Sequence, residues 1–142
     1  MTGKVFSINL SKRKGVKKIP VAKAVLLAGL GFEGDAHSGS GDRQVSLLPI
    51  ESIRNQPGPA MAGVFAENIT TEGIDLSRAG VGERWKIGRE AVIEISKIGK
   101  ECRRRCSVYR KTGSCIMPAE GVFAIVIKGG FIEPGDTIEE CS

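Results

Sequence analysis

Apolar and polar residues alternate along several short segments of the chain, which is the period of half-buried β-strands. The clearest alternation covers residues 4–10, 83–87 and 91–98, a continuous apolar run covers 121–127, and further strands are expected within 17–30, 44–48, 65–71 and 137–139. Pro20 favours an edge position or the start of its strand. A short helix is expected over 49–56, with Pro49 in its first turn. Glycine-containing turns separate these segments, so the pattern predicts one mainly all-β domain over residues 1–142, an antiparallel barrel or sandwich with one or two short helices.

Composition supports a folded domain and limits its expected partners and cellular location. The chain has 142 residues, of which 41% are hydrophobic, 26% are charged and 19 are glycine. Its formal net charge of +5 favours anionic partners such as phosphates, nucleic acid or acidic lipid, without choosing among them. The longest apolar run, residues 24–30, is too short to span a bilayer, and no export signal is expected. We therefore predict a cytoplasmic protein with reduced thiols and no membrane partner.

Three of the four cysteines lie in one short basic window, with the spacing Cys102-x3-Cys106-x8-Cys115. Lys100 precedes them, and the residues between the first two are arginines. Positive neighbours stabilise a thiolate, which is both a nucleophile and a soft metal ligand. Two alternatives stay open: buried structural thiols beside a solvated loop, and a zinc site completed from Cys115, Cys141 and His37.

Two polar segments are candidates for ligand binding. In the first, Gly34, Asp35 and His37 precede a flexible Gly/Ser loop and Arg43, whose planar guanidinium suits a phosphate. A lone histidine is also commonly a hydrogen-bonded surface residue. In the second, Glu67 and Asn68 are adjacent, so on a strand they would point to opposite faces, one serving a site while the other holds a turn. The alternative for this pair is an edge strand with solvated polar groups.

The segment from Lys12 to Lys18 is strongly basic. Its simplest interpretation is a solvated hairpin at a sheet edge. Because no aromatic residues are interleaved with it, the segment disfavours nucleic-acid binding. A zinc-stabilised module that binds nucleic acid is kept as an alternative function.

Together these segments resemble the MOSC domain, the C-terminal domain of molybdenum cofactor sulfurases. The resemblance is carried by residues 34–37, 43–48, 65–73, 81–83, 87–88, 98–102 and 135–136. The spacing Cys102-x3-Cys106 and the segment Cys115-Ile-Met-Pro118 are similar to those of small stand-alone prokaryotic members. The resemblance implies a β-barrel of the type inserted in pyruvate kinase.

The resemblance also implies a function: binding of the molybdenum cofactor (molybdopterin), or carriage of persulfide sulfur for its sulfuration or for metal–sulfur cluster assembly. Cys102 would carry the persulfide or ligate molybdenum, with Cys106 as a resolving thiol or second ligand. The other site residues would be Asp35, His37, Arg43, Glu67, Asn68 and Lys100. We expect Asp35, His37, Arg43 and either Glu67 or Asn68 to share one pocket with Cys102.

The resemblance implies partner proteins as well. The pyridoxal-phosphate desulfurase domain of full sulfurases has no counterpart in these 142 residues, so pyridoxal phosphate is expected only on a separate cysteine desulfurase-type donor. Molybdenum cofactor biosynthesis proteins or molybdoenzymes are the other expected partners. An alternative within the enzyme class is a small molybdenum-dependent reductase of N-hydroxylated compounds.

Overall fold

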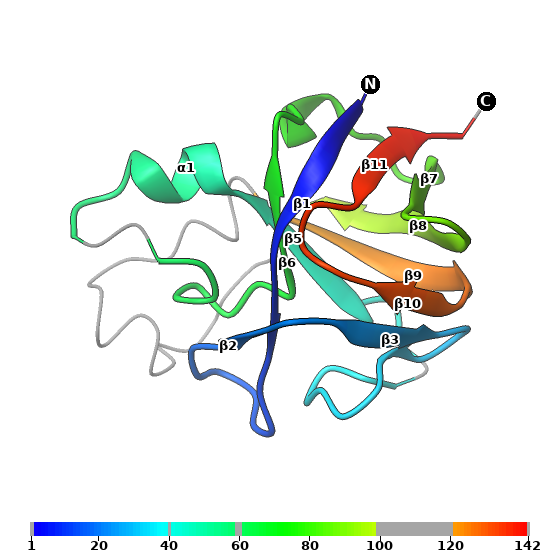
Figure 1. The fold of residues 1–142 in the computed structure, drawn as a ribbon, viewed down its shortest axis with the longest axis horizontal. Coiled ribbons are helices and arrows are strands. Elements are labelled where there is room, and N and C mark those ends of the chain that lie inside the picture. The colour runs from blue at the N-terminus through cyan, green and yellow to red at the C-terminus, as the bar shows by residue number, and fades with distance from the viewer. Residues whose placement is uncertain (1, 40, 59–60, 99–120, 142) are drawn as a thin grey trace.

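The computed structural model describes residues 2–39, 41–58, 61–98 and 121–141, and within them the chain is almost entirely β-structure (Figure 1). The strands are β1 (Thr2–Leu10), β2 (Ile19–Val21), β3 (Ala24–Leu27), β4 (Gly31–Phe32), β5 (Val45–Pro49), β6 (Ile69–Glu72), β7 (Arg84–Ile87), β8 (Ala91–Ile98), β9 (Val122–Lys128), β10 (Gly130–Ile132) and β11 (Thr137–Glu140). The helices of this described part are α1 (Ile50–Arg54) and the 3-10 turn η1 (Leu76–Arg78). The predicted all-β fold with a short helix within 49–56 is therefore confirmed.

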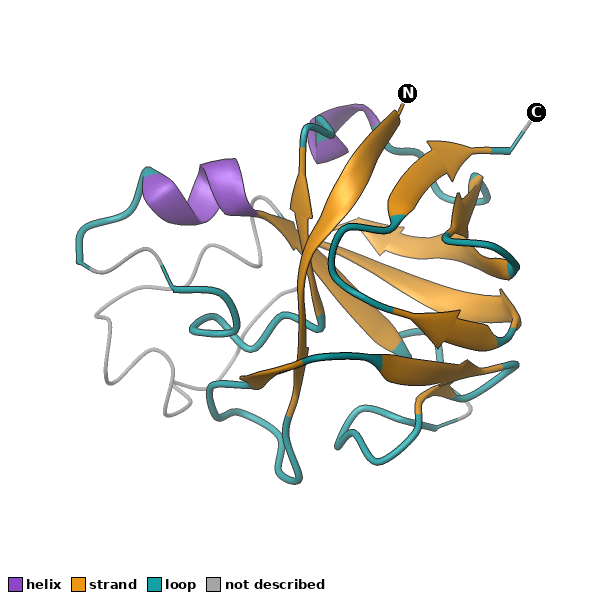
Figure 2. Ribbon diagram, viewed as in Figure 1, coloured by secondary structure: helices purple, strands orange, loops and turns teal. Residues whose placement is uncertain are grey.

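Seven of the described strands close into a barrel in the order β11-β7-β8-β9-β5-β6-β1, and β11 pairs with β1 to complete the ring. The one parallel pair among the described strands is β5–β6. Parallel neighbours need a long crossover, and α1 with the segment up to residue 68 supplies it (Figure 2). β2 extends the sheet beyond β1, so Pro20 does lie on an edge strand as predicted.

The barrel interior is a single hydrophobic core, formed where alternate residues of each strand point inward. Fully buried side chains such as Val45 and Leu47 on β5, and Ile93 and Ile95 on β8, belong to it. Sheet β10-β3-β4 adds further side chains to the same core. Among the described residues no helix has the length and apolar character to cross a lipid bilayer.

The outer wall of the barrel is also covered on one side. A second apolar cluster joins Leu48 and Phe123, which point outward from β5 and β9, to Ile50 and Ile53 of α1 and to Phe65. Outward-facing positions on this side are therefore removed from water, which the alternation of polar and apolar residues does not reveal.

One predicted strand begins later than expected. The segment 65–71 is rich in β-forming residues, but β6 begins only at Ile69. Ala66 has a φ of 65°, in the left-handed region that costs an L-residue about 1–2 kcal/mol. The turn at Ala66 interrupts the extended conformation before β6 begins, and it directs Glu67 and Asn68 onto the outer wall. The two- and three-residue strands β4 and β10 were not predicted, because such short segments show no period.

Candidate functional site

Polar side chains form a buried layer on the covered part of the outer wall. We call Ser7, Asn9, Ser46, Glu67, Asn68 and Thr70 the polar layer; each is at most 7% exposed. Ser7, Asn9, Ser46 and Thr70 come from strands β1, β5 and β6, while Glu67 and Asn68 immediately precede β6. Buried polar groups are stable only when they are hydrogen-bonded, so this layer depends on its partners.

The segment before β6 is held against β1 and β2 by backbone contacts. Lys18 N donates to the carbonyl oxygen of Gly63 at 2.8 Å, and Asn9 N donates to that of Asn68 at 2.7 Å. Gly63 has a φ of 86°, and a Cβ there would lie 2.2 Å from the carbonyl oxygen of Lys18. Only glycine fits at this close approach.

Two asparagines connect the layer. The Asn9 side-chain amide donates to the carbonyl oxygen of Glu67 at 3.1 Å and to Thr70 Oγ1 at 2.9 Å. Asn68 Nδ2 donates to the Asn9 carbonyl oxygen at 3.2 Å. Asn68 Oδ1 accepts from the backbone N–H and the hydroxyl of Ser46, at 3.0 and 3.2 Å. Both asparagines therefore have fixed orientations.

Glu67 is the buried acid of the layer. Its Oε2 accepts from Gly63 N at 2.8 Å and from Thr70 Oγ1 at 2.7 Å, whereas Oε1 is buried and has no hydrogen-bond partner among the described residues. Burial raises the pKa of Glu67, and the hydrogen bonds from Gly63 and Thr70 offset only part of that effect. The side chain thus keeps one oxygen that can bind a further group.

This raised pKa predicts how stability depends on pH. The folded state favours protonated Glu67. The stability that this preference adds is therefore fully present below the ordinary pKa of a glutamate, and it is lost as the pH rises through the raised pKa of Glu67 in the folded protein. We expect the wild type to lose stability relative to Glu67→Gln as the pH rises, which urea unfolding between about pH 4 and pH 8 will measure. The exposed Glu139→Gln is the control. If the difference in the free energy of unfolding between Glu67→Gln and the wild type does not change with pH, the interpretation is contradicted.

Asp35 lies next to this layer in a buried ion pair. Its Oδ1 is 2.8 Å from Lys18 Nζ and accepts from Ser11 N at 3.0 Å, and both charged side chains are fully buried. Its Oδ2 accepts from His37 N at 3.0 Å and lies 3.8 Å from His37 Nδ1. Burial alone would raise the pKa of Asp35, but the hydrogen bond and charge of Lys18, helped by Ser11 and Asn68, lower it. Asp35 is therefore a carboxylate that fixes the turn carrying His37.

Arg43 lies two residues before β5, on a different part of the same wall. It is half-buried, and its guanidinium carbon is 5.6 Å from the centre of the Phe123 ring. Because Phe123 pairs with Ser46 in the sheet, Arg43 borders the polar layer. The structure thus brings Asp35 and His37 together, and Glu67 and Asn68 together beside them, with Arg43 at the margin.

The cysteine segment cannot be placed against these groups. Lys100, Cys102, Cys106 and Cys115 lie outside the described residues, so a pocket shared with Cys102 stays a prediction. Cys141 is exposed and free. Within the part of the chain that the structure describes, no three His, Cys, Asp or Glu side chains are grouped so that they could hold a metal ion.

The structure contradicts one alternative and one expectation about exposure. Glu67 and Asn68 are completely buried, which contradicts the alternative of an edge strand with solvated polar groups. Lys18 was expected in the solvated basic hairpin but is 1% exposed, while Lys17 beside it is exposed as predicted. No local signal separates these two lysines, because the charged partner of Lys18 is 17 residues away in the sequence. Asn9 occupies a polar position of an alternating strand, so the sequence offers no signal that it is buried in the layer.

Comparison with known proteins decides the family. The MOSC domain model matches residues 34–139, which is most of the chain. This chain belongs to the MOSC domain family. The family is associated with the molybdenum cofactor, and the matched range contains every candidate site residue except Lys18 and those contributed by β1.

The relatives of this MOSC domain include proteins named YiiM. Protein YiiM from Escherichia coli K12 is 31% identical in an alignment 113 positions long that covers 71% of this chain and 50% of that protein. The chain therefore spans about half the length of this curated relative. The crystal structure of the YUAD protein from Bacillus subtilis has a TM-score of 0.81 at 20% identity, covering 99% of this chain and 96% of that one. YiiM from Geobacillus stearothermophilus has a TM-score of 0.76 at 23% identity, covering 99% and 75%. At these identities the structural matches establish the fold alone.

Proposed function

We propose that this MOSC domain binds the molybdenum cofactor beside the polar layer and carries persulfide sulfur on Cys102. The observation that supports the proposal is Glu67 Oε1, a buried oxygen without a partner among the described residues. An unsatisfied polar atom of this kind costs about 1–3 kcal/mol, so it is a candidate for contact with a ligand. Asp35, which also holds the turn that carries His37, is linked to the same layer through the side chain of Asn68.

The residues present fit the chemistry of the cofactor. Its pterin carries N–H groups that need acceptors, which Glu67 can provide. Its phosphate needs a cation, and Arg43 stacks on an aromatic ring without an ion pair to any described carboxylate. Lys18 is already committed to Asp35, so Lys100 is the proposed second cation. When bound, the cofactor supplies a molybdenum ion, for which a cysteine thiolate is a suitable ligand.

The proposed sulfur step needs no additional oxidant. The Cys102 thiolate attacks the outer sulfur of a persulfide on the donor, a separate cysteine desulfurase. The donor S–S bond breaks, a new S–S bond forms on Cys102, and the donor leaves as a thiolate. Attack of Cys106 on the inner sulfur then gives a Cys102–Cys106 disulfide and releases hydrosulfide for the acceptor.

Cofactor binding is tested by expressing the protein in a host that makes molybdopterin. We expect molybdenum and pterin to copurify with the wild type, measured by elemental analysis and by fluorescence of the oxidised pterin. Arg43→Gln should weaken pterin retention by about 10-fold or more, because a charge-assisted contact to phosphate is lost. Arg54→Gln is a matched control, because Arg54 stacks on Phe6 at 5.5 Å but on a different part of the surface. Equal retention by both variants, or no pterin on the wild type, would contradict the proposal.

A further inference from the structure

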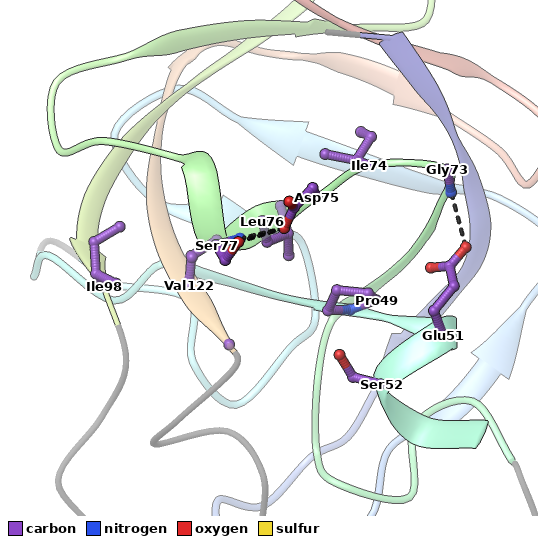
Figure 3. Close-up of a pocket in the computed structure, with 11 residues that line it drawn as sticks. Pro49, Glu51, Ser52, Gly73, Ile74, Asp75, Leu76, Ser77, Ile98 and Val122 are labelled. Atoms are coloured by element: carbon purple, nitrogen blue, oxygen red, sulfur yellow. Dashed lines mark hydrogen bonds between the residues drawn. The ribbon is translucent and has the colours of Figure 1, made fainter. Parts of the chain in front are cut away.

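A cavity, here called the mouth pocket, opens at one mouth of the barrel, between α1 and η1 (Figure 3). Its volume is about 440 Å³, within the range of about 300–1,000 Å³ typical of small-molecule sites. The ends of β8 and β9 contribute Ile98 and Val122, and the segment after β6 contributes Ile74 and Leu76. Barrel mouths are common positions for ligand sites, and this floor is apolar.

The mouth pocket is distinct from the polar layer. Val122 faces the barrel interior and belongs to the main core, whereas the next residue, Phe123, faces outward toward Arg43. The two sites therefore lie on opposite faces of the same strand. Nothing about the pocket depends on the proposed cofactor site.

The charge of the mouth pocket contrasts with that of the whole chain. Glu51 and Asp75 line it, and no lysine, arginine or histidine does so among the described residues, although the protein has a net charge of +5. Hydrogen bonds from Ser77, and to a smaller extent the charge of Arg78 outside the pocket lining, lower the pKa of Asp75. An anionic ligand such as a phosphate would be repelled here, and a cation would be attracted.

Both carboxylates keep one oxygen available. Glu51 Oε2 accepts from Gly73 N at 3.0 Å, and Asp75 Oδ1 accepts from the backbone N–H and the hydroxyl of Ser77 (Figure 3). The second oxygen of each takes no hydrogen bond from a described residue. The backbone bonds hold the carboxylates at the rim, above the apolar floor.

We propose that the mouth pocket binds a small organic cation with an apolar body. The ammonium or guanidinium group would pair with Glu51 and Asp75, and the apolar body would lie against Ile98 and the floor. The carboxylates provide the selection for charge. The floor residues Ile74, Leu76 and Val122 are at most 5% exposed, so the area removed from water belongs to the ligand's apolar body and to Ile98, which is 48% exposed.

The test compares three probes of similar shape: benzylammonium, benzyl alcohol and benzoate. With isotope-labelled isoleucine methyl groups, NMR should show saturable shifts of Ile74 and Ile98 with benzylammonium. Benzyl alcohol should bind about fivefold more weakly, because the pairing of the ammonium group with the exposed carboxylates of Glu51 and Asp75 is lost, and benzoate should bind more weakly still. Ile19 in β2 is exposed and outside the pocket, so its methyl group should not move.

The second part of the test removes the two carboxylate charges of the mouth pocket. Glu51→Gln and Asp75→Asn keep acceptors for Gly73 and Ser77, and together they should reduce benzylammonium affinity to that of benzyl alcohol. Glu133→Gln removes the same charge outside this pocket and should leave the affinity unchanged. The proposal is overturned if benzoate shifts the same methyl groups as strongly, if neither Ile74 nor Ile98 moves, or if the double variant binds benzylammonium as tightly as the wild type. The comparison of probes on the wild type decides the question even if a variant does not fold.

Discussion

Lys18→Met is expected to destabilise the domain by about 3–5 kcal/mol, because it leaves the buried carboxylate of Asp35 without its counter-ion. Asp35 anchors Ser11 and the turn that carries His37, so the loss should also loosen the candidate site. Denaturant unfolding followed by Trp85 fluorescence measures the change in the free energy of unfolding.

Three comparisons separate the ion pair from a general effect of losing a lysine. Lys17→Met, one residue away and exposed, should change stability by less than about 0.5 kcal/mol. Adding Asp35→Asn to Lys18→Met should restore part of the loss, because no charge then stays buried without a partner. A loss in Lys18→Met no larger than that in Lys17→Met would contradict the structural role of the pair.

The same ion pair predicts a dependence on pH. In the folded wild type the pKa of Asp35 is lowered. The stability that ionised Asp35 contributes is therefore present above the ordinary pKa of an aspartate, and it is lost as the pH falls through the lowered pKa of Asp35 in the folded protein. In Lys18→Met burial is unopposed by the lysine, and Asp35 can be protonated more readily. The difference in stability between the two proteins should therefore narrow from about pH 7 to about pH 3, the opposite direction to that expected for Glu67→Gln.

Cys102→Ser is expected to abolish sulfur loading from a cysteine desulfurase, because a serine hydroxyl cannot replace a thiolate as the acceptor of sulfane sulfur. The measurement is alkylation of the persulfide followed by mass spectrometry. Cys106→Ser should still load sulfur but release it slowly without the resolving thiol. This experiment tests the sulfur half of the proposed function, independently of cofactor retention.

The remaining cysteines are the controls for that experiment. Cys115→Ser should keep most of the loading, and Cys141→Ser should keep all of it, since Cys141 is exposed at the end of β11. Normal loading of Cys102→Ser together with loss in Cys106→Ser would show that the thiol is assigned to the wrong residue, even though the family stands.

The sequence predicted the strands because strand alternation is a local property, while the choice of a barrel over a sandwich came from the family resemblance. Residues 4–10, 83–87 and 91–98 each show the period of two, and their observed strands match these ranges closely. Pro20 indicated an edge for the same reason, since it cannot donate a hydrogen bond to a neighbouring strand. The short helix was also predictable, because proline is favoured where a helix begins and Pro49 directly precedes α1.

Only the tertiary structure decided which polar residues are buried. Alternation assigns Ser46 and Thr70 to the outer face of their strands, but it does not show that a segment ending at Asn68 covers that face. Lys17 and Lys18 are identical in type and adjacent in sequence, and only one meets a buried carboxylate. The reason is physical: a period reports the direction of a side chain from its own strand, whereas burial depends on what a distant part of the chain places over it.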